Sequence, residues 1–363
     1  MVPCPGDNGC CRQGISSRLC NIADHNGLAV CSTPFLLEKC AGRRIARCLQ
    51  VRNAVRSLRK RGCACIVVYV WDFKLDVSTR VTQWNLKCYH IDDEYTWSET
   101  ETPIPERERC LLSSVDQVFV HSERMFEKKG RLNPNTLLVP NGVDYAAYTA
   151  TCQEPPDLAS IPHPRIGCVG WVKRQLDLRL LLELSRRHSQ WSFVFVGPSK
   201  PARHFGDQLA TLEQLRKVPN VYFLGNKPVE ELPSYTQYFD VGILCYCVND
   251  YTKYINPLKL HEYLAAGIPA VGSDIPALRP FRDVVKIATT FDEWSDSLRA
   301  AIAPTAKSVE QRSARRAVAN RYDWNQIVVT IVHAICARLG RRDIEPLLAR
   351  HESKNVAHSG KCQ

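Results

Sequence analysis

A lysine and a glutamate stand three residues apart, at Lys259 and Glu262, just after the start of a predicted helix. Asn256 suits the N-cap of that helix, and Pro257 suits its first position, where no backbone N–H is needed. A helix start offers free N–H groups and a positive dipole end, which both favour phosphate. Residues three apart share a helix face, and Glu262 lies about 9 Å along the axis from the cap. This spacing suits a diphosphate at the helix tip and a ribose diol at the carboxylate.

The predicted helix ends at Gly267, and Pro269 prevents its continuation before a short strand at 270–272. Taken alone, Lys259 and Glu262 are more simply explained as a solvated surface pair, which contributes little to stability. The choice between a nucleotide site and a surface pair therefore depends on the rest of the chain.

Length and charge limit the class of protein. A chain of 363 residues can hold two domains, each with its own hydrophobic core. The net charge of +11 favours anionic partners, among them phosphorylated substrates and acidic lipid surfaces. Basic residues are scattered, and no zinc-finger, RNA-recognition or helix-turn-helix pattern occurs. Nucleic acid is therefore the least favoured partner, and none is expected.

The sequence predicts neither a membrane span nor a secretion signal. Its most apolar stretch, 327–339, is too short to cross a bilayer and is broken by polar residues. The start has no basic region followed by an apolar core. We therefore expect a cytoplasmic protein whose membrane contact, if it has one, is peripheral, at the inner face of the plasma membrane.

Seventeen cysteines form an odd number, and no Cys-x-x-Cys pair occurs. Without a secretion signal, this count argues against a disulfide framework, and the missing pair argues against a zinc site. The cysteines that alternate within predicted strands are expected to be small buried apolar groups, at Cys63, Cys65, Cys245 and Cys247.

Two series of short apolar strands alternate with helices, which is typical of parallel sheets covered on both faces. Predicted strands of the first series lie at 65–71, 86–91, 117–120 and 136–139. Those of the second lie at 165–169, 192–196, 220–224, 241–244 and 270–272. We predict an N-terminal domain at 1–145 (irregular over 1–27), a Pro-rich linker at 146–164 and a second domain at 165–308. Terminal helices at 309–340 would pack back across the cleft, followed by a loose tail at 341–363.

Several motifs occur in an order typical of one family. They are YHIDDEY at 89–95, VDQVFVHS at 115–122, VPNGVD at 139–144, IGCVG at 166–170, WSFVFVGP at 191–198, NVYFLG at 220–225, YFDVGI at 238–243 and the block at 257–273. In these motifs the chain resembles the retaining glycosyltransferases of family 4, or group 1, particularly bacterial surface-polysaccharide and teichuronic-acid enzymes. The resemblance implies an α/β GT-B fold, with two doubly wound Rossmann-like domains facing a cleft.

The resemblance also implies that the second domain binds a nucleotide-sugar and the first binds the acceptor. Glu262 takes the ribose-binding position, and the start of its helix faces the diphosphate. The loop after Gly170 is where the family places basic residues against phosphate, although Lys173 and Arg174 equally suit a solvated loop pair. The donor-site candidates are Gly170, Lys173, Arg174, Gly225, Lys253, Asn256, Pro257, Lys259 and Glu262.

Three polar residues in the first domain follow a strand at its carboxyl end, where open α/β sheets hold their ligands. Because the family often has a functional histidine or aspartate near this point, His90, Asp92 and Asp93 are the catalytic candidates. One of them would orient the acceptor hydroxyl or contact the transferred sugar. Capping of the strand–loop junction is an equal alternative. His121, at a similar strand end, is more simply a helix-flanking residue.

Two features depart from the family pattern. The acidic residue that the family places eight positions before Glu262 is Tyr254 here. The opening strand, glycine-rich turn and helix of the family are not evident before Leu28. We therefore expect an N-terminal domain that is divergent or incomplete at its start.

The sequence predicts transfer of a sugar from a nucleoside diphosphate-sugar to a hydroxyl of a glycan or lipid-linked acceptor, in cell-surface polysaccharide synthesis. Retention is implied by the resemblance alone. No Asp-x-Asp motif occurs, so neither a metal nor a cofactor is expected, and cations and a helix dipole would stabilise the diphosphate. A catalytically silent GT-B protein that binds nucleotide or glycan is the alternative. An NAD-dependent oxidoreductase is less favoured, because GCVG at 167–170 does not match Gly-x-Gly-x-x-Gly.

Overall fold

The computed structural model describes residues 21–25, 28–32, 35–95, 98, 100–199, 201 and 204–340. These divide into two units. One is the described part of Met1–His90 with Pro105–Val118, and the other is Ile91–Ile104 with the described part of Phe119–Gln363. Segments 91–104 and 119–145, which the sequence assigns to the first domain, thus belong to the second unit. Long-range bonds hold them there, such as the one from the Glu101 N–H to Asp250 Oδ2 at 2.7 Å.

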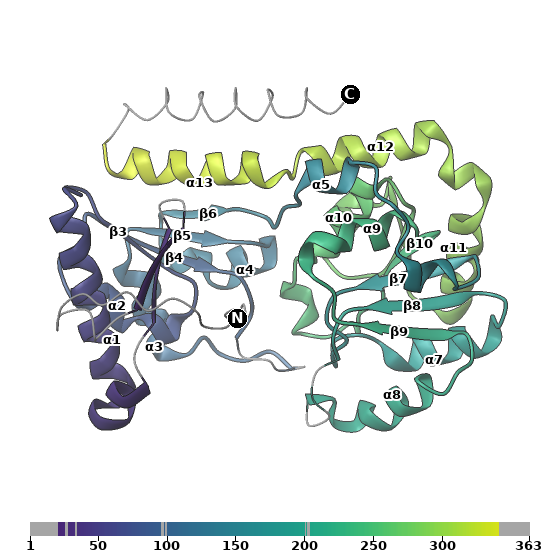
Figure 1. Ribbon diagram of the computed structural model, residues 1–363, viewed down its shortest axis with the longest axis horizontal. Helices are drawn as coiled ribbons and strands as arrows, with labels where there is room; N and C mark the ends of the chain where they lie inside the picture. Colours follow the sequence, from purple (N-terminus) through teal and green to yellow (C-terminus); the bar gives the residue numbers. More distant parts are fainter. Residues whose placement is uncertain are drawn as a thin grey trace. The chain divides into compact units, whose positions relative to one another are not determined.

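In the first unit, the described residues begin with a hairpin and a long helix. Strand β1 (Asn21–His25) pairs antiparallel with β2 (Leu28–Ser32), and the two form a sheet of their own. Helix α1 (Phe35–Lys60) follows and appears in purple in Figure 1. The expectation that 1–27 is irregular is therefore wrong at β1, where a short polar strand carries none of the apolar alternation that marks strands in a sequence. Helices α2 (Val77–Arg80) and α3 (Glu106–Ser114) complete the unit.

A four-stranded sheet has the order β3-β4-β5-β6. Its strands are β3 (Val67–Val70), β4 (Leu86–Ile91), β5 (Gln117–Val120) and β6 (Thr136–Leu138), and β3 pairs parallel with β4. Strand β3 is shorter than predicted, so Cys63 and Cys65 precede it, and Cys63 is exposed rather than buried. Cys245 is buried as expected. The ten cysteines whose side chains the structure describes are free thiols.

A six-stranded sheet, wholly parallel, has the order β12-β11-β10-β7-β8-β9. Its strands are β7 (Arg165–Val169), β8 (Ser192–Val196), β9 (Val221–Gly225), β10 (Val241–Leu244), β11 (Ala270–Ser273) and β12 (Val285–Ala288). This is the strand order of doubly wound nucleotide-binding sheets, which reverses direction between the first and fourth strands. Here that reversal lies between β7 and β10, and ligands of such sheets bind beyond the carboxyl ends of these strands.

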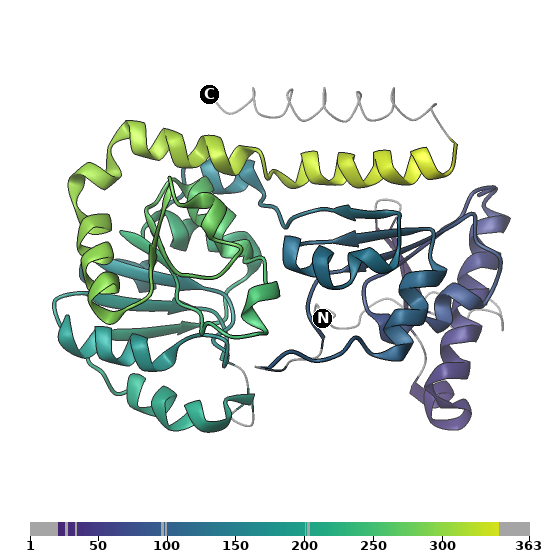
Figure 2. The same ribbon diagram turned by 180° about the vertical axis from the view of Figure 1, so that it is seen from behind.

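Helices cover both faces of the six-stranded sheet (Figures 1 and 2). One group that packs together contains α7 (Leu178–Arg187), α8 (Leu209–Leu215) and α11 (Phe291–Ile302). The other contains α9 (Leu232–Gln237), α10 (Leu258–Ala266) and α12 (Val309–Asn320). One continuous hydrophobic core runs through the sheet and both groups, because its strands are buried on both faces.

The predicted linker at 146–164 folds as part of the second unit. It contains most of α5 (Tyr145–Thr149) and all of α6 (Pro156–Ala159). Leu158 is fully buried, and the Asp157 carboxylate pairs with Lys227 at 2.5 Å and accepts from the Tyr235 hydroxyl at 2.8 Å. The prediction of a linker is wrong here. The four prolines mark turns between short helices, because proline at a first helical position is compatible with folding.

Helix α4 (Glu123–Lys128) follows β5, and α13 (Trp324–Arg338) is the last helix described. The start of α13 packs on the segment before α5: the Val143 N–H donates to the Tyr322 carbonyl at 2.9 Å. Near its end, the Arg338 guanidinium donates to Asn135 Oδ1 at 2.5 Å. Within the described ranges, no helix combines the length and apolar character that spanning a bilayer requires.

Candidate functional site

A cavity of about 300 Å³ lies at the carboxyl ends of β7 and β10, where the strand order reverses. The turn after β7 contributes Gly170 and Lys173, and the loop after β10 contributes Tyr246. The start of α10 forms a third wall. Of the predicted site residues, eight line this one cavity: Asp92, Asp93, Gly170, Lys173, Asn256, Pro257, Lys259 and Glu262.

Lys259 is one of the cations that line the cavity. Its Nζ lies 3.6 Å from Cys168 Sγ and 5.8 Å from the centre of the Tyr246 ring. No carboxylate in the described part of the chain lies within ion-pairing distance of it. Burial alone would lower the pKa of Lys259, but Cys168, Tyr246 and Glu262 outweigh burial and hold it above its ordinary value. Among the described residues, Lys259 is therefore a cation that forms no ion pair with a carboxylate.

Glu262 sits one turn further along α10, in the same cavity. Burial raises the pKa of its carboxyl, while a hydrogen bond from the Tyr148 hydroxyl and the charge of Lys259 lower it. The Tyr148 side chain comes from α5, in the segment that the sequence assigned to a linker. A carboxylate held in this way can accept two hydroxyl hydrogen bonds, as a ribose diol would require.

The start of α10 differs from the prediction at Asn256. The N-cap of the helix is Pro257, with no side-chain cap, and Leu258 is the first helical residue. The Asn256 amide instead donates to the His121 carbonyl at 2.7 Å, and the Asn256 carbonyl accepts from Asn141 Nδ2 at 2.7 Å. Asn256 therefore positions the helix, and the N–H groups of its first turn are not occupied by a cap.

Two glycines bring the β7 turn close to α10. Gly170 has a φ of +96°, and a Cβ atom there would lie 3.5 Å from Lys259 Cε. Behind it, Gly197 has a φ of +144°, and a Cβ atom there would lie 2.2 Å from the Gly170 carbonyl oxygen. Only glycine fits both demands at 197, since the conformation is rare for other residues and backbone fills the space.

Asp93 and His121 also line the cavity. Burial raises the pKa of Asp93, although the Tyr251 hydroxyl donates to its carboxylate at 2.7 Å. His121 Nδ1 lies 2.9 Å from the Ile91 carbonyl, so this nitrogen carries the proton and Nε2 does not. Burial lowers the pKa of His121, so the ring is neutral at pH 7. Asp92 is exposed and accepts from the Tyr95 hydroxyl.

Four predicted site residues do not line this cavity: His90, Arg174, Gly225 and Lys253. His90 belongs to the first unit, where Nδ1 lies 2.7 Å from the Tyr69 hydroxyl and the ring stacks on Trp71 at 4.3 Å. Lys253 Nζ pairs with Glu101 at 2.5 Å and with Asp250 at 3.1 Å. It is thus neutralised by protein carboxylates, and its predicted contact with phosphate has no geometric support.

Sequence reasoning missed several residues of the site. Tyr148, Tyr246 and Tyr251 surround the candidate carboxylates and cation, and buried tyrosines give no signal that separates them from core residues. Gln175 also lines the cavity, and its Oε1 is buried without a hydrogen-bond partner among the described residues. Its position next to Lys173 and Arg174 was the available hint.

Part of the chain around this site is similar to a known family. Residues 163–303 match the family model described as Glycosyl transferases group 1. A relative, the TuaH protein of Bacillus subtilis (strain 168), is 31% identical over 235 residues, which cover 62% of this chain and 56% of the relative. The chain thus spans little more than half the length of this relative, which is named, provisionally, a teichuronic acid biosynthesis glycosyltransferase.

Solved structures resemble the chain over most of its length. An E. coli trehalose-6-phosphate protein bound with UDP-2-fluoro glucose matches with a TM-score of 0.66 and 14% identity, over 89% of this chain and 90% of that one. Anabaena HepE in complex with UDP-glucose matches with a TM-score of 0.60 and 16% identity, over 79% and 82%. Likeness at such low identity concerns the fold. Residues 163–303 are therefore similar to group 1 glycosyl transferases, and the chain has the GT-B fold.

Proposed function

We propose that this protein transfers a sugar from a nucleoside diphosphate-sugar to a hydroxyl of a glycan or lipid-linked acceptor, in cell-surface polysaccharide synthesis. The observation that carries the proposal is the cavity at the strand reversal, which brings Lys259 and Glu262 together at the uncapped start of α10. A phosphate would be the anionic partner of Lys259, since no described carboxylate forms an ion pair with this lysine. The related TuaH and the UDP-sugar complexes of similar folds support the same chemistry.

In this proposal, Glu262 binds the ribose, and the diphosphate lies between Lys259, Lys173 and the first N–H groups of α10. As the sugar leaves, negative charge grows on the diphosphate, and fixed cations and a helix dipole stabilise it without reorganising. The proposal requires neither a metal nor a cofactor. Asp93 and His121, which line the same cavity, would contact the sugar, and retention is the stereochemical course that the resemblance implies.

The test is calorimetric titration of UDP, GDP, dTDP, CDP and NAD into wild type and Glu262→Ala. One nucleoside diphosphate should bind best, and the variant should bind it more than about tenfold more weakly (~1.4 kcal/mol) because the ribose loses its carboxylate. Equal binding by both proteins would remove Glu262 from the site. Binding of NAD alone would overturn the proposal.

The silent GT-B alternative predicts binding without turnover. Wild type is incubated with a UDP-, GDP- or dTDP-sugar, with water or an added glycoside as acceptor of the sugar. Release of the nucleoside diphosphate by wild type, and not by Glu262→Ala, identifies an enzyme. Tight binding of every such sugar with no release over hours would favour the silent protein.

We also propose that the protein contacts anionic membrane at the periphery, through helix α1. The outward side chains of this helix recur every three or four residues and so lie on one face. Ile45 and Leu49 are 57% and 37% exposed, and basic residues with no ion-pair partner in the described ranges follow them, at Arg52, Arg56, Arg59 and Lys60. An apolar end followed by free cations suits the headgroup region of acidic lipid.

Co-sedimentation with vesicles tests this membrane proposal. Arg52→Glu/Arg56→Glu should bind vesicles of 30% phosphatidylglycerol at least about tenfold more weakly, since each cation contributes ~1 kcal/mol near an anionic surface. The matched control is Arg179→Glu/Arg299→Glu, an equal charge change at exposed arginines that already have acidic partners. An equal loss in both variants would show that total charge, and not α1, determines the binding.

A further inference from the structure

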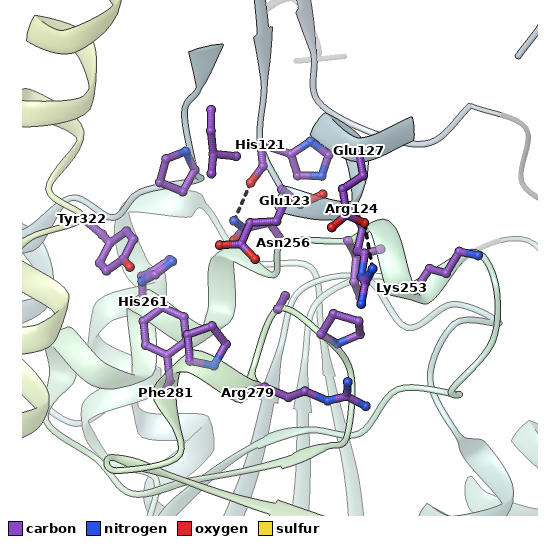
Figure 3. Close-up of a pocket in the computed structure, with 17 residues that line it drawn as sticks. His121, Glu123, Arg124, Glu127, Lys253, Asn256, His261, Arg279, Phe281 and Tyr322 are labelled. Atoms are coloured by element: carbon purple, nitrogen blue, oxygen red, sulfur yellow. Dashed lines mark hydrogen bonds and ion pairs between the residues drawn. The ribbon is translucent and has the colours of Figure 1, made fainter. Parts of the chain in front are cut away.

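A second cavity, of about 370 Å³, lies next to the candidate donor cavity within the second unit. The two share a wall formed by His121, Ile255 and Asn256. Figure 3 shows residues of α4 on one side of it and, on the other, His261 of α10 with the loop after β11. Its volume is at the small end of the range for ligand sites.

Each arginine and lysine that lines this cavity is paired with a carboxylate. Arg124 pairs with Glu127 at 2.7 Å, Lys253 pairs with Glu101 and Asp250, and Arg279 pairs with Asp274 at 2.7 Å. These cations are therefore not available to a phosphate in the way that Lys259 is. Glu123 differs: it is exposed and has no hydrogen-bond or ion-pair partner in the described part of the chain.

An aromatic cluster forms the facing wall. The His261 ring stacks on Tyr322 with centroids 4.2 Å apart, and the edge of Phe281 meets it at 5.6 Å. Burial lowers the pKa of His261 to about 4, so the ring is uncharged at neutral pH. Its Nδ1 is buried and has no hydrogen-bond partner among the residues described. The unused polar groups here thus belong to a neutral ring and one carboxylate.

A ligand that fits must present hydrogen-bond donors to a carboxylate and an apolar face to aromatic rings, and it must carry no negative charge. A neutral pyranose meets all three conditions: its hydroxyls donate, and its C–H faces pack on aromatic faces, which are electron-rich. A uronic acid meets the first two and is repelled by Glu123. A nucleoside diphosphate finds no free cation here.

We propose that this second cavity holds an uncharged sugar ring of the acceptor, with Glu123 accepting its hydroxyls and Phe281 and Tyr322 packing on its face. The inference rests on the proposed function, since it makes the shared wall the place where the acceptor hydroxyl meets the donor sugar. His121 lies on that wall with an unprotonated Nε2, which can accept the hydrogen of that hydroxyl.

The test uses saturation-transfer NMR with methyl β-D-glucopyranoside, methyl N-acetyl-β-D-glucosaminide and methyl β-D-glucuronide. Wild type should bind the two neutral glycosides at least about fivefold more tightly than the glucuronide. Glu123→Gln should reduce that preference to less than about twofold, because the repelling charge is gone. Phe281→Leu should weaken all three. The matched controls Glu230→Gln and Phe126→Leu, outside the cavity, should behave as wild type.

Equal binding of glucoside and glucuronide by wild type would overturn the inference, and so would binding of none of the three. Urea unfolding of each variant shows whether it is folded. Calorimetry with the preferred nucleoside diphosphate separates this inference from the proposed function, since Glu123→Gln should leave that affinity unchanged. If nucleotide binds and glycosides do not, only the acceptor cavity is wrong. If no nucleotide binds, the proposed function fails whatever the glycosides do.

Discussion

Replacing Lys259 by methionine is expected to weaken binding of the preferred nucleoside diphosphate about 100-fold (~2.7 kcal/mol). Methionine keeps most of the apolar stem and removes the charge. A hydrogen bond between a cation and phosphate contributes about 1.5–3 kcal/mol, and Lys259 should be at the upper end of that range. Its ammonium is surrounded by Cys168 and Tyr246, and no described carboxylate competes with the ligand for it.

Lys253→Met is the matched control for this prediction, because it removes the same charge from the same region of the chain. Lys253 Nζ is already paired with Glu101 and Asp250, so we expect less than about a threefold change in nucleotide affinity. Calorimetry measures both. Comparable losses in the two variants would mean that general positive charge attracts the nucleotide and that Lys259 makes no direct contact.

Gly197→Ala is expected to lower the free energy of unfolding by at least about 3 kcal/mol. An alanine at this position must keep a backbone φ of +144°, and its methyl group would lie 2.2 Å from the Gly170 carbonyl oxygen. Relief requires movement of the β7 turn, since backbone rather than a flexible side chain fills the space. Nucleotide affinity should fall as well, because the same turn lies against Lys259.

Gly225→Ala separates backbone strain from steric overlap. Gly225 also has a positive φ, of +73°, but a Cβ atom there would meet nothing within 4 Å. The expected cost is about 1 kcal/mol, from conformation alone. Urea unfolding midpoints of the two variants give the difference. If both alanine variants lose the same free energy of unfolding, the close approach of Gly197 to Gly170 does not contribute to the effect.

The part of the site that is local in the chain could be predicted from the sequence. Gly267 and Pro269 fix the end of α10, and the spacing of Lys259 and Glu262 fixes their common face. Long-range partners could not be predicted. Asn256 is a favourable N-cap by type, but its amide is taken by the carbonyl of His121, 135 residues away. A lysine such as Lys253 can bind a phosphate, but Lys253 is paired with a carboxylate of Glu101, which lies far away in the sequence.

The same distinction holds for the fold. Apolar strands such as β7, β8 and β10 begin and end where predicted, because burial on both faces leaves a continuous apolar run. The segment before β7 was misread for the opposite reason. Its four prolines suggest an unfolded connection, and its docking depends on residues far along the chain, such as Tyr235 and Lys227.

That docked segment determines where the chain can be cut. A fragment that begins at 163, where the family match begins, would lack Glu154, which pairs with the buried Arg165 guanidinium. It would also lack Tyr148, whose hydroxyl holds Glu262. An isolated fragment that keeps the candidate donor site should therefore begin at or before Asp144, which caps α5. A fragment that begins at residue 163 would contain the entire six-stranded sheet, but it would lack Tyr148, which contacts the candidate ligand site at Glu262.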